Sequence, residues 1–513
     1  MRHEVACALA LILFLAAGAE AQDVKRGGFK ESFTEKHPLS SVGEWCKRYG
    51  DSIESIRKAD DKGGEYDLAR ESFDVYVPGG YDGSLPFGLV VFISPNPAAA
   101  DPEKSEIPIL DKHGLLWVGA INSGNERRKW HRANLALDAA HNMTKRYRID
   151  PDRVYVGGWS GGARMACEVA IGYADVFTGG FFMGDCNYFR GTQVVGENRF
   201  WKPDFSPPPA AMLEKARTRG RYAIFVGEKC GNRSFCLSIF ENGFKKDNFA
   251  YVQYFEQKDW GDRPPNTEWF EKLIQALDAP LTAEAPMVYA QAQKHEKAGK
   301  TKAALEAYIR AASHGRSQPF HADAKARMIE LRPRLEAEAK EAFGRLKAAP
   351  PPAPKLREFA RDWSGTEAGR SAREEANTLG EGELEKTGAK TGTALRTELQ
   401  KFLTAWEGYP VATSALKTLD AEAQKDYDKA ATIDSERARH LKLLAFAKTW
   451  APSTVATRAR DVVDVEAGQQ LEDIKKLPTD REKIARLQPF LQVYAETTTG
   501  AQAKALLDKL KQK

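Results

Sequence analysis

The motif Gly158-Trp159-Ser160-Gly161-Gly162 constrains the fold of this chain more than any other feature of the sequence. The apolar run 154–156 precedes the motif, and the small helix-forming residues Ala163 and Ala166 follow it. Glycines permit a sharp turn and close packing of a strand against a helix, so the serine oxygen stands exposed at the end of the strand. The pattern predicts a nucleophile elbow at Ser160. The alternative is a glycine-rich turn with an idle serine.

Apolar runs and helical stretches alternate on both sides of this motif. Short unbroken apolar runs are typical of buried parallel strands, and the alternating pattern before Pro78 is typical of an antiparallel edge strand. Strands are expected at 72–78, 89–93, 115–120, 154–158, 180–183, 222–226 and 251–255, with helices at 132–147 and 268–277. This order predicts a doubly wound α/β domain.

Length and charge narrow the class of protein. A chain of 513 residues is too long for one hydrophobic core and suits several domains. Its net charge is only +5, and we find no dense run of Lys and Arg with interleaved aromatic residues, so no nucleic-acid partner is predicted. The sequence also lacks paired cysteine spacing and an H-x-E-x-x-H motif, so neither a metal nor a cofactor is predicted.

The N-terminus has the pattern of a signal peptide over residues 1–21. A basic start is followed by an apolar run too short to span a bilayer comfortably, and then by Ala19-Glu20-Ala21. Cleavage would leave Gln22 first. We therefore expect a secreted or periplasmic protein with no membrane span after signal removal; the alternative is an uncleaved anchor helix.

An exported chain can form disulfides. Five cysteines remain after residue 21, an odd number, so at least one thiol stays free or pairs between chains. Cys186 and Cys230 each follow a predicted strand, and such strand ends can be neighbours in a doubly wound sheet. The hypothesis is a bridge from Cys186 to Cys230 or Cys236.

Several segments together carry a family resemblance. Pro78 with Tyr81-Asp82, the run 149–156 before the serine motif, and Trp269-Phe270-Glu271 resemble α/β-hydrolases of the secreted esterase group, which includes feruloyl esterases and polyhydroxybutyrate depolymerases. The resemblance covers roughly residues 70–280 and implies an ester substrate, either a small molecule or a polymer. It also implies that Ser160 is the nucleophile, followed in the chain by an acid and then by a histidine base.

The other triad positions depart from the family pattern. Between Ser160 and Pro280 the sequence contains no histidine; Asp262 stands at the position where the family has its histidine, and Cys230 at that of its acid. A serine hydroxyl without a base is a weak nucleophile. His131 is the candidate for a replacement base, and the alternative is a surface or capping histidine. The loop after Ile93 begins Ser94-Pro95, and proline has no N–H for an oxyanion.

The second half of the chain has helical periodicity with almost no strand signal. Spacings from Val288 to Ala311 resemble a tetratricopeptide hairpin, and the run 347–354 is typical of a stiff Pro-rich linker. Beyond the linker, aromatic pairs with a four-residue gap recur every 43 or 44 residues, at Phe359 and Trp363, Phe402 and Trp406, Phe446 and Trp450, and Phe490 and Tyr494. Four copies in register predict stacked helical hairpins; the alternative is a set of unrelated amphipathic helices.

The predicted organisation is a signal peptide (1–21), an α/β-hydrolase-like domain (22–280), tetratricopeptide-like hairpins (281–345), a Pro-rich linker (346–355) and helical repeats (356–513). Three functional hypotheses follow. The chain is an esterase with a relocated base such as His131, or a catalytically weak or silent hydrolase fold that binds its ligand, or a scaffold that binds a protein partner through its helical repeats.

Overall fold

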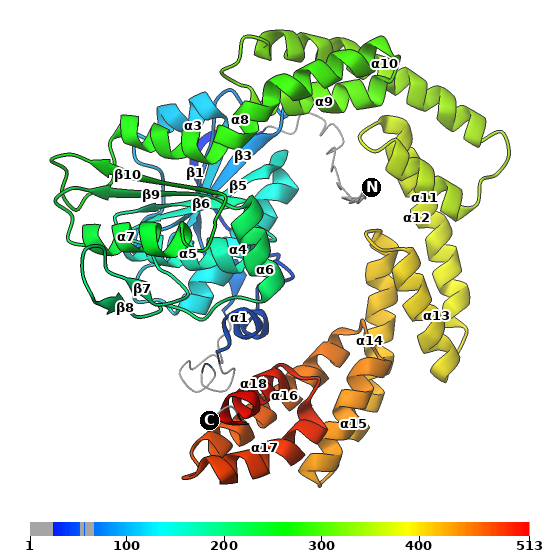
Figure 1. Cartoon of the computed structure of the whole chain (residues 1–513). Helices are drawn as coiled ribbons and strands as arrows, with labels where there is room; N and C mark the ends of the chain where they lie inside the picture. Colours follow the sequence, from blue (N-terminus) through cyan, green and yellow to red (C-terminus); the bar gives the residue numbers. More distant parts are fainter. Residues whose placement is uncertain (1–23, 52–55, 57–65, 512–513) are drawn as a thin grey trace, which may run out of the picture. The chain divides into compact units, whose positions relative to one another are not determined.

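The computed structural model describes residues 24–51, 56 and 66–511. The chain divides after residue 332 into two compact units, and the first contains all the strands (Figure 1). The predicted signal peptide (1–21) lies outside the described residues. No helix in the described ranges is both long enough and apolar enough to cross a membrane.

The first unit is organised around an eight-stranded sheet with the order β1-β2-β4-β3-β5-β6-β9-β10. All neighbouring strands pair in parallel except that β2 pairs antiparallel with both β1 and β4. The strands are β1 (Gly27–Glu31), β2 (Phe73–Val77), β3 (Phe87–Ile93), β4 (Leu115–Ala120), β5 (Ile149–Trp159), β6 (Gly179–Met183), β9 (Arg221–Gly227) and β10 (Tyr251–Gln257). A separate hairpin is formed by β7 (Thr192–Gln193) and β8 (Phe200–Trp201).

Helices cover both faces of this sheet, because its central strands are apolar on both sides. One core lies beneath α1 (Val42–Tyr49), α4 (Lys129–Arg146), α5 (Gly161–Gly172), α6 (Ala210–Arg219) and α7 (Arg233–Ile239). The other lies beneath α3 (Ile107–His113) and the first part of α8 (Thr267–Lys297). Short helices η1 (Leu68–Arg70) and η2 (Phe240–Phe244) complete the unit. The expected α/β class is confirmed.

The sequence placed the edge of the sheet wrongly. It predicted an edge strand at 72–78, but the corresponding strand β2 lies between β1 and β4 and is buried throughout. The edge is β1, whose segment Gly-Gly-Phe-Lys-Glu alternates between half-buried and exposed residues. Because two of its five residues are glycines and two are charged, this strand has no apolar run by which it could be predicted.

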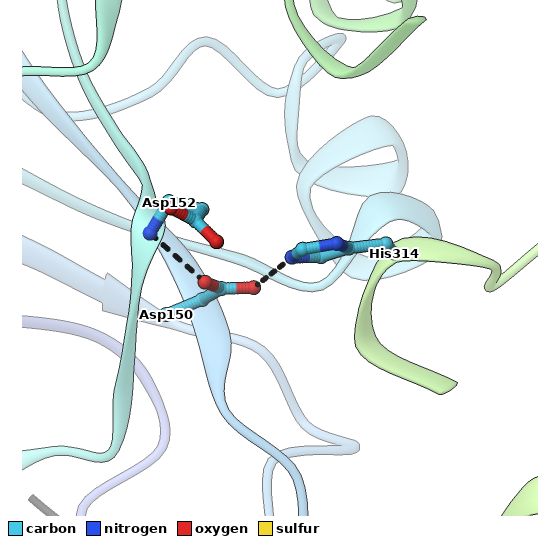
Figure 2. A group of neighbouring side chains, drawn as sticks. All are labelled: Asp150, Asp152 and His314. Atoms are coloured by element: carbon cyan, nitrogen blue, oxygen red, sulfur yellow. Dashed lines mark hydrogen bonds and ion pairs between the residues drawn. The ribbon is translucent and has the colours of Figure 1, made fainter. Parts of the chain in front are cut away.

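Helix α8 continues through residue 280, where the sequence predicted a domain boundary, and packs against α9 (Thr301–His314). The end of α9 is held against the start of β5, where the Nε2 atom of the buried His314 lies 3.0 Å from Asp150 Oδ2 (Figure 2). The Asp152 carboxylate lies 3.7 Å from Arg310. This cluster fastens the α8–α9 hairpin to the sheet. The predicted domain boundaries themselves stay predictions.

The remaining helices follow one another along the chain, and from residue 353 on they pack in consecutive pairs as hairpins. They are α10 (His321–Leu346), which crosses the division between the units, α11 (Ala353–Asp362), α12 (Glu367–Gly388), α13 (Gly392–Ala405), α14 (Pro410–Ala431), α15 (Glu436–Thr449), α16 (Thr454–Lys475), α17 (Asp480–Tyr494) and α18 (Thr498–Lys511). The second helices of successive hairpins, α12, α14, α16 and α18, contact one another in that order. An all-α repeat region therefore follows the sheet, as expected.

The aromatic pairs of the repeat end the first helix of each hairpin and pack into the core. Their ring centroids are 5.9, 5.6, 6.1 and 4.5 Å apart in the four copies. The second helices supply small residues at equivalent positions, and Ala372, Ala415, Ala459 and Ala503 are fully buried. A Cβ atom on Gly500 would lie 1.7 Å from the Tyr494 carbonyl oxygen, so the short side chain is a packing requirement. The predicted repeat is confirmed as four helical hairpins.

The predicted disulfide is not formed. Cys186, Cys230 and Cys236 are all free thiols, and all are buried. The sequence argument located neighbours correctly, since Cys186 and Cys236 are close enough to share a side-chain hydrogen bond. Burial raises the pKa of the Cys186 thiol, which keeps it protonated.

Candidate functional site

Ser160 lies in the sharp turn between β5 and α5, at the carboxyl end of the central strand. Its φ is +49° and its ψ is −124°, a strained conformation for a non-glycine residue. The flanking glycines make the turn feasible, because a Cβ atom on Gly162 would lie 1.9 Å from the Ile93 carbonyl oxygen. The Ser160 amide donates to the Met183 carbonyl at 2.8 Å. Ser160 therefore has the backbone of a nucleophile elbow.

Cys230 and Asp262, the residues expected at the two other triad positions, lie next to each other. Cys230 follows β9, Asp262 follows β10, and the Cys230 thiol donates to Asp262 Oδ1 at 3.7 Å. Burial is the main cause of a raised pKa at Cys230. The thiol and the carboxylate thus occupy neighbouring places, as an acid and a histidine would. Neither residue lines the cavity beside Ser160.

His131 lies near the start of α4 and is buried. Its ring packs edge-on against Tyr66, with the centroids 5.5 Å apart. Lys129 and Arg132, three positions apart on the helix, line the cavity beside Ser160, whereas His131 does not. Residues three apart share a helix face, so the residue between them points elsewhere. That His131 acts as the base for Ser160 stays a prediction.

A cavity of about 500 Å³ opens beside Ser160, and its walls are polar. Three cations and three carboxylates line it: Lys129, Arg132 and Arg164, and Glu168, Asp185 and Asp204. Three amides, Asn125, Asn187 and Asn232, also line the wall. No histidine belongs to this lining. The sequence identified Ser160 but none of the charged residues around it.

Most of these charges are already paired. Lys129 Nζ lies 2.7 Å from Glu168 Oε1, and Arg164 Nε donates to Asp185 Oδ2 at 2.5 Å. Asn232 donates to the same oxygen of Asp185 at 3.1 Å. The Tyr188 amide donates to Asp204 at 2.8 Å. The paired groups hold the wall in one arrangement.

Burial shifts the pKa values of these groups toward their neutral forms. It raises the pKa of Glu168 in spite of the Lys129 ammonium, and it raises the pKa of Asp185 to about 6 although Arg164 opposes the shift. The pKa of Asp204 is raised as well, for the same reason. Burial lowers the pKa of Arg132 to about 10, which leaves this guanidinium charged at neutral pH.

The Ser160 hydroxyl makes no side-chain hydrogen bond with any residue of the described ranges. A nucleophilic serine needs a base within about 2.6–3.2 Å to take its proton. Arg132 donates to the carbonyl oxygens of Ser94 and Gly161 at 3.2 and 3.3 Å, which ties the loop after β3 to the start of α5. The geometry presents a strained, half-buried serine beside a charged cavity.

No protein-family model matches the chain. A stretch of 88 residues is 36% identical to poly(3-hydroxyalkanoate) depolymerase C of Paucimonas lemoignei. The matched stretch covers 17% of this chain and 21% of that protein. The sheet-bearing unit has an α/β-hydrolase fold and resembles the esterase group. The chain spans only about a fifth of the length of this curated relative.

Two solved structures that resemble part of this chain come from Bordetella parapertussis and Butyrivibrio proteoclasticus. LpqC, a poly(3-hydroxybutyrate) depolymerase from Bordetella parapertussis, is 17% identical and has a TM-score of 0.30, with 40% of this chain and 88% of that chain covered. Est1E from Butyrivibrio proteoclasticus is 11% identical and has a TM-score of 0.29, with 41% and 95% covered.

Among the described residues, two groups of side chains bring metal-ligand atoms within 4.8 Å of one another, one in each unit. In the first, Asp150, Asp152 and His314, the carboxylates already bind His314 and Arg310. The second comprises Glu436, His440 and Glu466. In it, Arg439 donates to Glu466 at 2.8 Å and the two ring nitrogens of His440 contact Tyr494 and Glu466. Protein partners satisfy both groups, and the absence of a metal stays a prediction.

Proposed function

We propose that this protein is an exported member of the esterase-like α/β-hydrolases that binds a ligand in the Ser160 cavity and hydrolyses esters weakly or not at all. Export is inferred from the signal-peptide pattern of residues 1–21. N-terminal sequencing of the secreted chain tests it, with Gln22 expected as the first residue. A chain that retains residues 1–21 would contradict cleavage after Ala21 and favour the uncleaved anchor helix.

One observation carries the proposal: the Ser160 hydroxyl has no hydrogen-bonded base among the described residues, although the elbow and a cavity of about 500 Å³ are present. Cys230 and Asp262 stand at the other triad positions. Loss of triad members costs on the order of 10⁴ to 10⁶ in turnover. The depolymerase similarity supports an ester or polyester as the ancestral substrate.

The test is hydrolysis of p-nitrophenyl acetate and p-nitrophenyl butyrate by the full mature chain beside its Ser160→Ala variant. We expect the two rates to agree within about twofold, because an unassisted hydroxyl adds little to the background reaction. Hydrolysis that disappears in Ser160→Ala would contradict the proposal. That result would make the chain an active esterase, and His131→Ala would then test whether His131 is the base.

The second candidate function is a scaffold that binds a protein partner through the helical repeats. Four hairpins in register favour it, as does a second cavity of about 470 Å³ between α15, α16 and α17, lined by Phe490 and Tyr494. Affinity purification with the full chain and with a chain ending at residue 332 tests it. Partners that survive the truncation would contradict the scaffold function.

A further inference from the structure

We propose that the Ser160 cavity binds a zwitterionic ligand, with Glu168 and Asn187 holding its ammonium group and Arg132 holding its carboxylate. This inference rests on the proposed function, since it names the class of ligand for the same cavity. The ligand class is an amino acid or the free ends of a short peptide.

Glu168 has an oxygen atom with no partner. The residue is 0% exposed, and its Oε1 accepts from Lys129 Nζ at 2.7 Å and from Asn187 Nδ2 at 2.5 Å. Its Oε2 is buried and has no hydrogen-bond partner among the described residues. A buried acceptor left unpaired is costly, so an oxygen at the wall of a cavity calls for a donor from a ligand.

Asn187 supplies a second acceptor beside it. Its Nδ2 must face Glu168, because a carboxylate accepts hydrogen bonds and cannot donate them. Its Oδ1 is therefore turned away from Glu168, and this oxygen is buried and unpartnered. Glu168 and Asn187 both line the cavity, and an ammonium group offers three N–H donors from one centre, which suits a site with both a charged and a neutral acceptor.

Arg132 supplies the complementary charge. It is 5% exposed, and its Nε is buried without a partner. Lys129 and Arg164 already pair with carboxylates, whereas the hydrogen bonds of Arg132 to described residues go to the Ser94 and Gly161 carbonyl oxygens. A guanidinium without a carboxylate partner matches an anionic group of the ligand, placed beside the elbow.

The charge balance of the wall favours a ligand that is neutral overall. Three cations line the cavity with three carboxylates, so a purely cationic or purely anionic ligand would leave one unpaired charge. A zwitterion adds one charge of each sign. The volume of about 500 Å³ lies within the usual range of small-ligand sites and has room for a short peptide.

The experiment is isothermal titration calorimetry of the full-length Ser160→Ala chain, which cannot turn the ligand over at this serine. The probes are trialanine with free ends, N-acetyl-trialanine, trialanine amide and free L-alanine. We expect trialanine or alanine to bind, and each blocking group to weaken the binding of trialanine at least about tenfold. Tighter binding of alanine would identify an amino-acid ligand, and tighter binding of trialanine a peptide ligand.

Two variants place the charges on the named residues. Glu168→Gln should weaken the binding of trialanine at least about tenfold and leave the binding of N-acetyl-trialanine unchanged. Arg132→Gln should likewise weaken the binding of trialanine at least about tenfold and leave the binding of trialanine amide unchanged. Glu268→Gln, an exposed carboxylate on α8, is the matched control and should change nothing. If a cavity variant does not fold, the comparison of free and blocked peptides on the Ser160→Ala chain decides alone.

Absence of binding, or equal binding of free and blocked peptides, would overturn the inference. That outcome would leave the hydrolysis result untouched. Conversely, ester hydrolysis that depends on Ser160 would contradict the proposed function while the titrations still stood, so the two failures are distinguishable.

Discussion

The two ends of strand β5 carry buried charges that are satisfied to different degrees. At its start, Arg153 donates to both oxygens of Asp278 at 3.0 and 2.7 Å, and the Tyr155 hydroxyl donates to the same carboxylate at 2.7 Å. At its end, beside Ser160, Glu168 and Arg132 each keep a buried polar atom without a partner. The Arg153–Asp278 pair holds α8 to the sheet, whereas Glu168 and Arg132, which keep polar atoms without a partner among the described residues, line a cavity that can take a ligand.

The largest effect is expected from breaking the satisfied pair at the start of β5. Asp278→Ala would leave the Arg153 guanidinium buried without a counter-charge, since its side chain is only 2% exposed. We expect the free energy of unfolding to fall by about 3–5 kcal/mol. Urea unfolding followed by tryptophan fluorescence measures it.

The matched control is Glu268→Ala, which removes an exposed carboxylate paired with Lys272 on the same helix. Its effect should stay within about 0.5 kcal/mol. If Asp278→Ala were as mild as this control, the paired charges would not be what fastens α8 to the sheet.

A smaller effect concerns pH and Asp185, at the cavity. Burial raises its pKa from 3.8 to about 6, so the folded chain binds more protons than the unfolded chain between these values. The contribution of Asp185 to the free energy of unfolding should therefore fall as the pH rises through this window, by about 3 kcal/mol in all. Comparing unfolding of the natural chain and Asp185→Asn at pH 4, 5, 6 and 7 reveals it. Parallel profiles would show that Asp185 titrates normally.

The smallest effect on stability is expected at Glu168. Burial raises the pKa of the Glu168 carboxyl, so replacing Glu168 with Gln removes a buried charge that is costly to hold. The same replacement also removes the ion pair with Lys129. These changes oppose each other, so the free energy of unfolding should move by no more than about 1 kcal/mol. A loss as large as that of Asp278→Ala would erase the contrast between the two ends of β5.

Much of the fold could be predicted from the sequence because its signals are local. The central strands are unbroken apolar runs, and Leu115–Ala120 appears as β4 with the expected bounds. The aromatic pairs of the repeats report helix faces directly. Two errors had non-local causes: β1 is recognisable only through its pairing with β2, and α8 runs on through Pro280 and Pro286, which normally end helices.

The site was less predictable, because only Ser160 carries a local motif. Glu168 is two helical turns after the elbow and Asp185 follows β6, so their convergence depends on how α5 packs on the sheet. Nothing in the sequence shows that Arg132 lines the cavity and the neighbouring His131 does not. The difference depends on the direction in which each side chain leaves α4. The proximity of Cys230 to Asp262 did follow from their places after adjacent parallel strands.

The most direct measurement is the reaction of the purified mature chain with a fluorophosphonate probe, beside Ser160→Ala and an active esterase of this fold. The account predicts no labelling of the natural chain under conditions that label the reference esterase, because the Ser160 hydroxyl has no hydrogen-bonded base in the described part of the chain. Labelling that is lost in Ser160→Ala would demonstrate an activated serine and contradict the central claim.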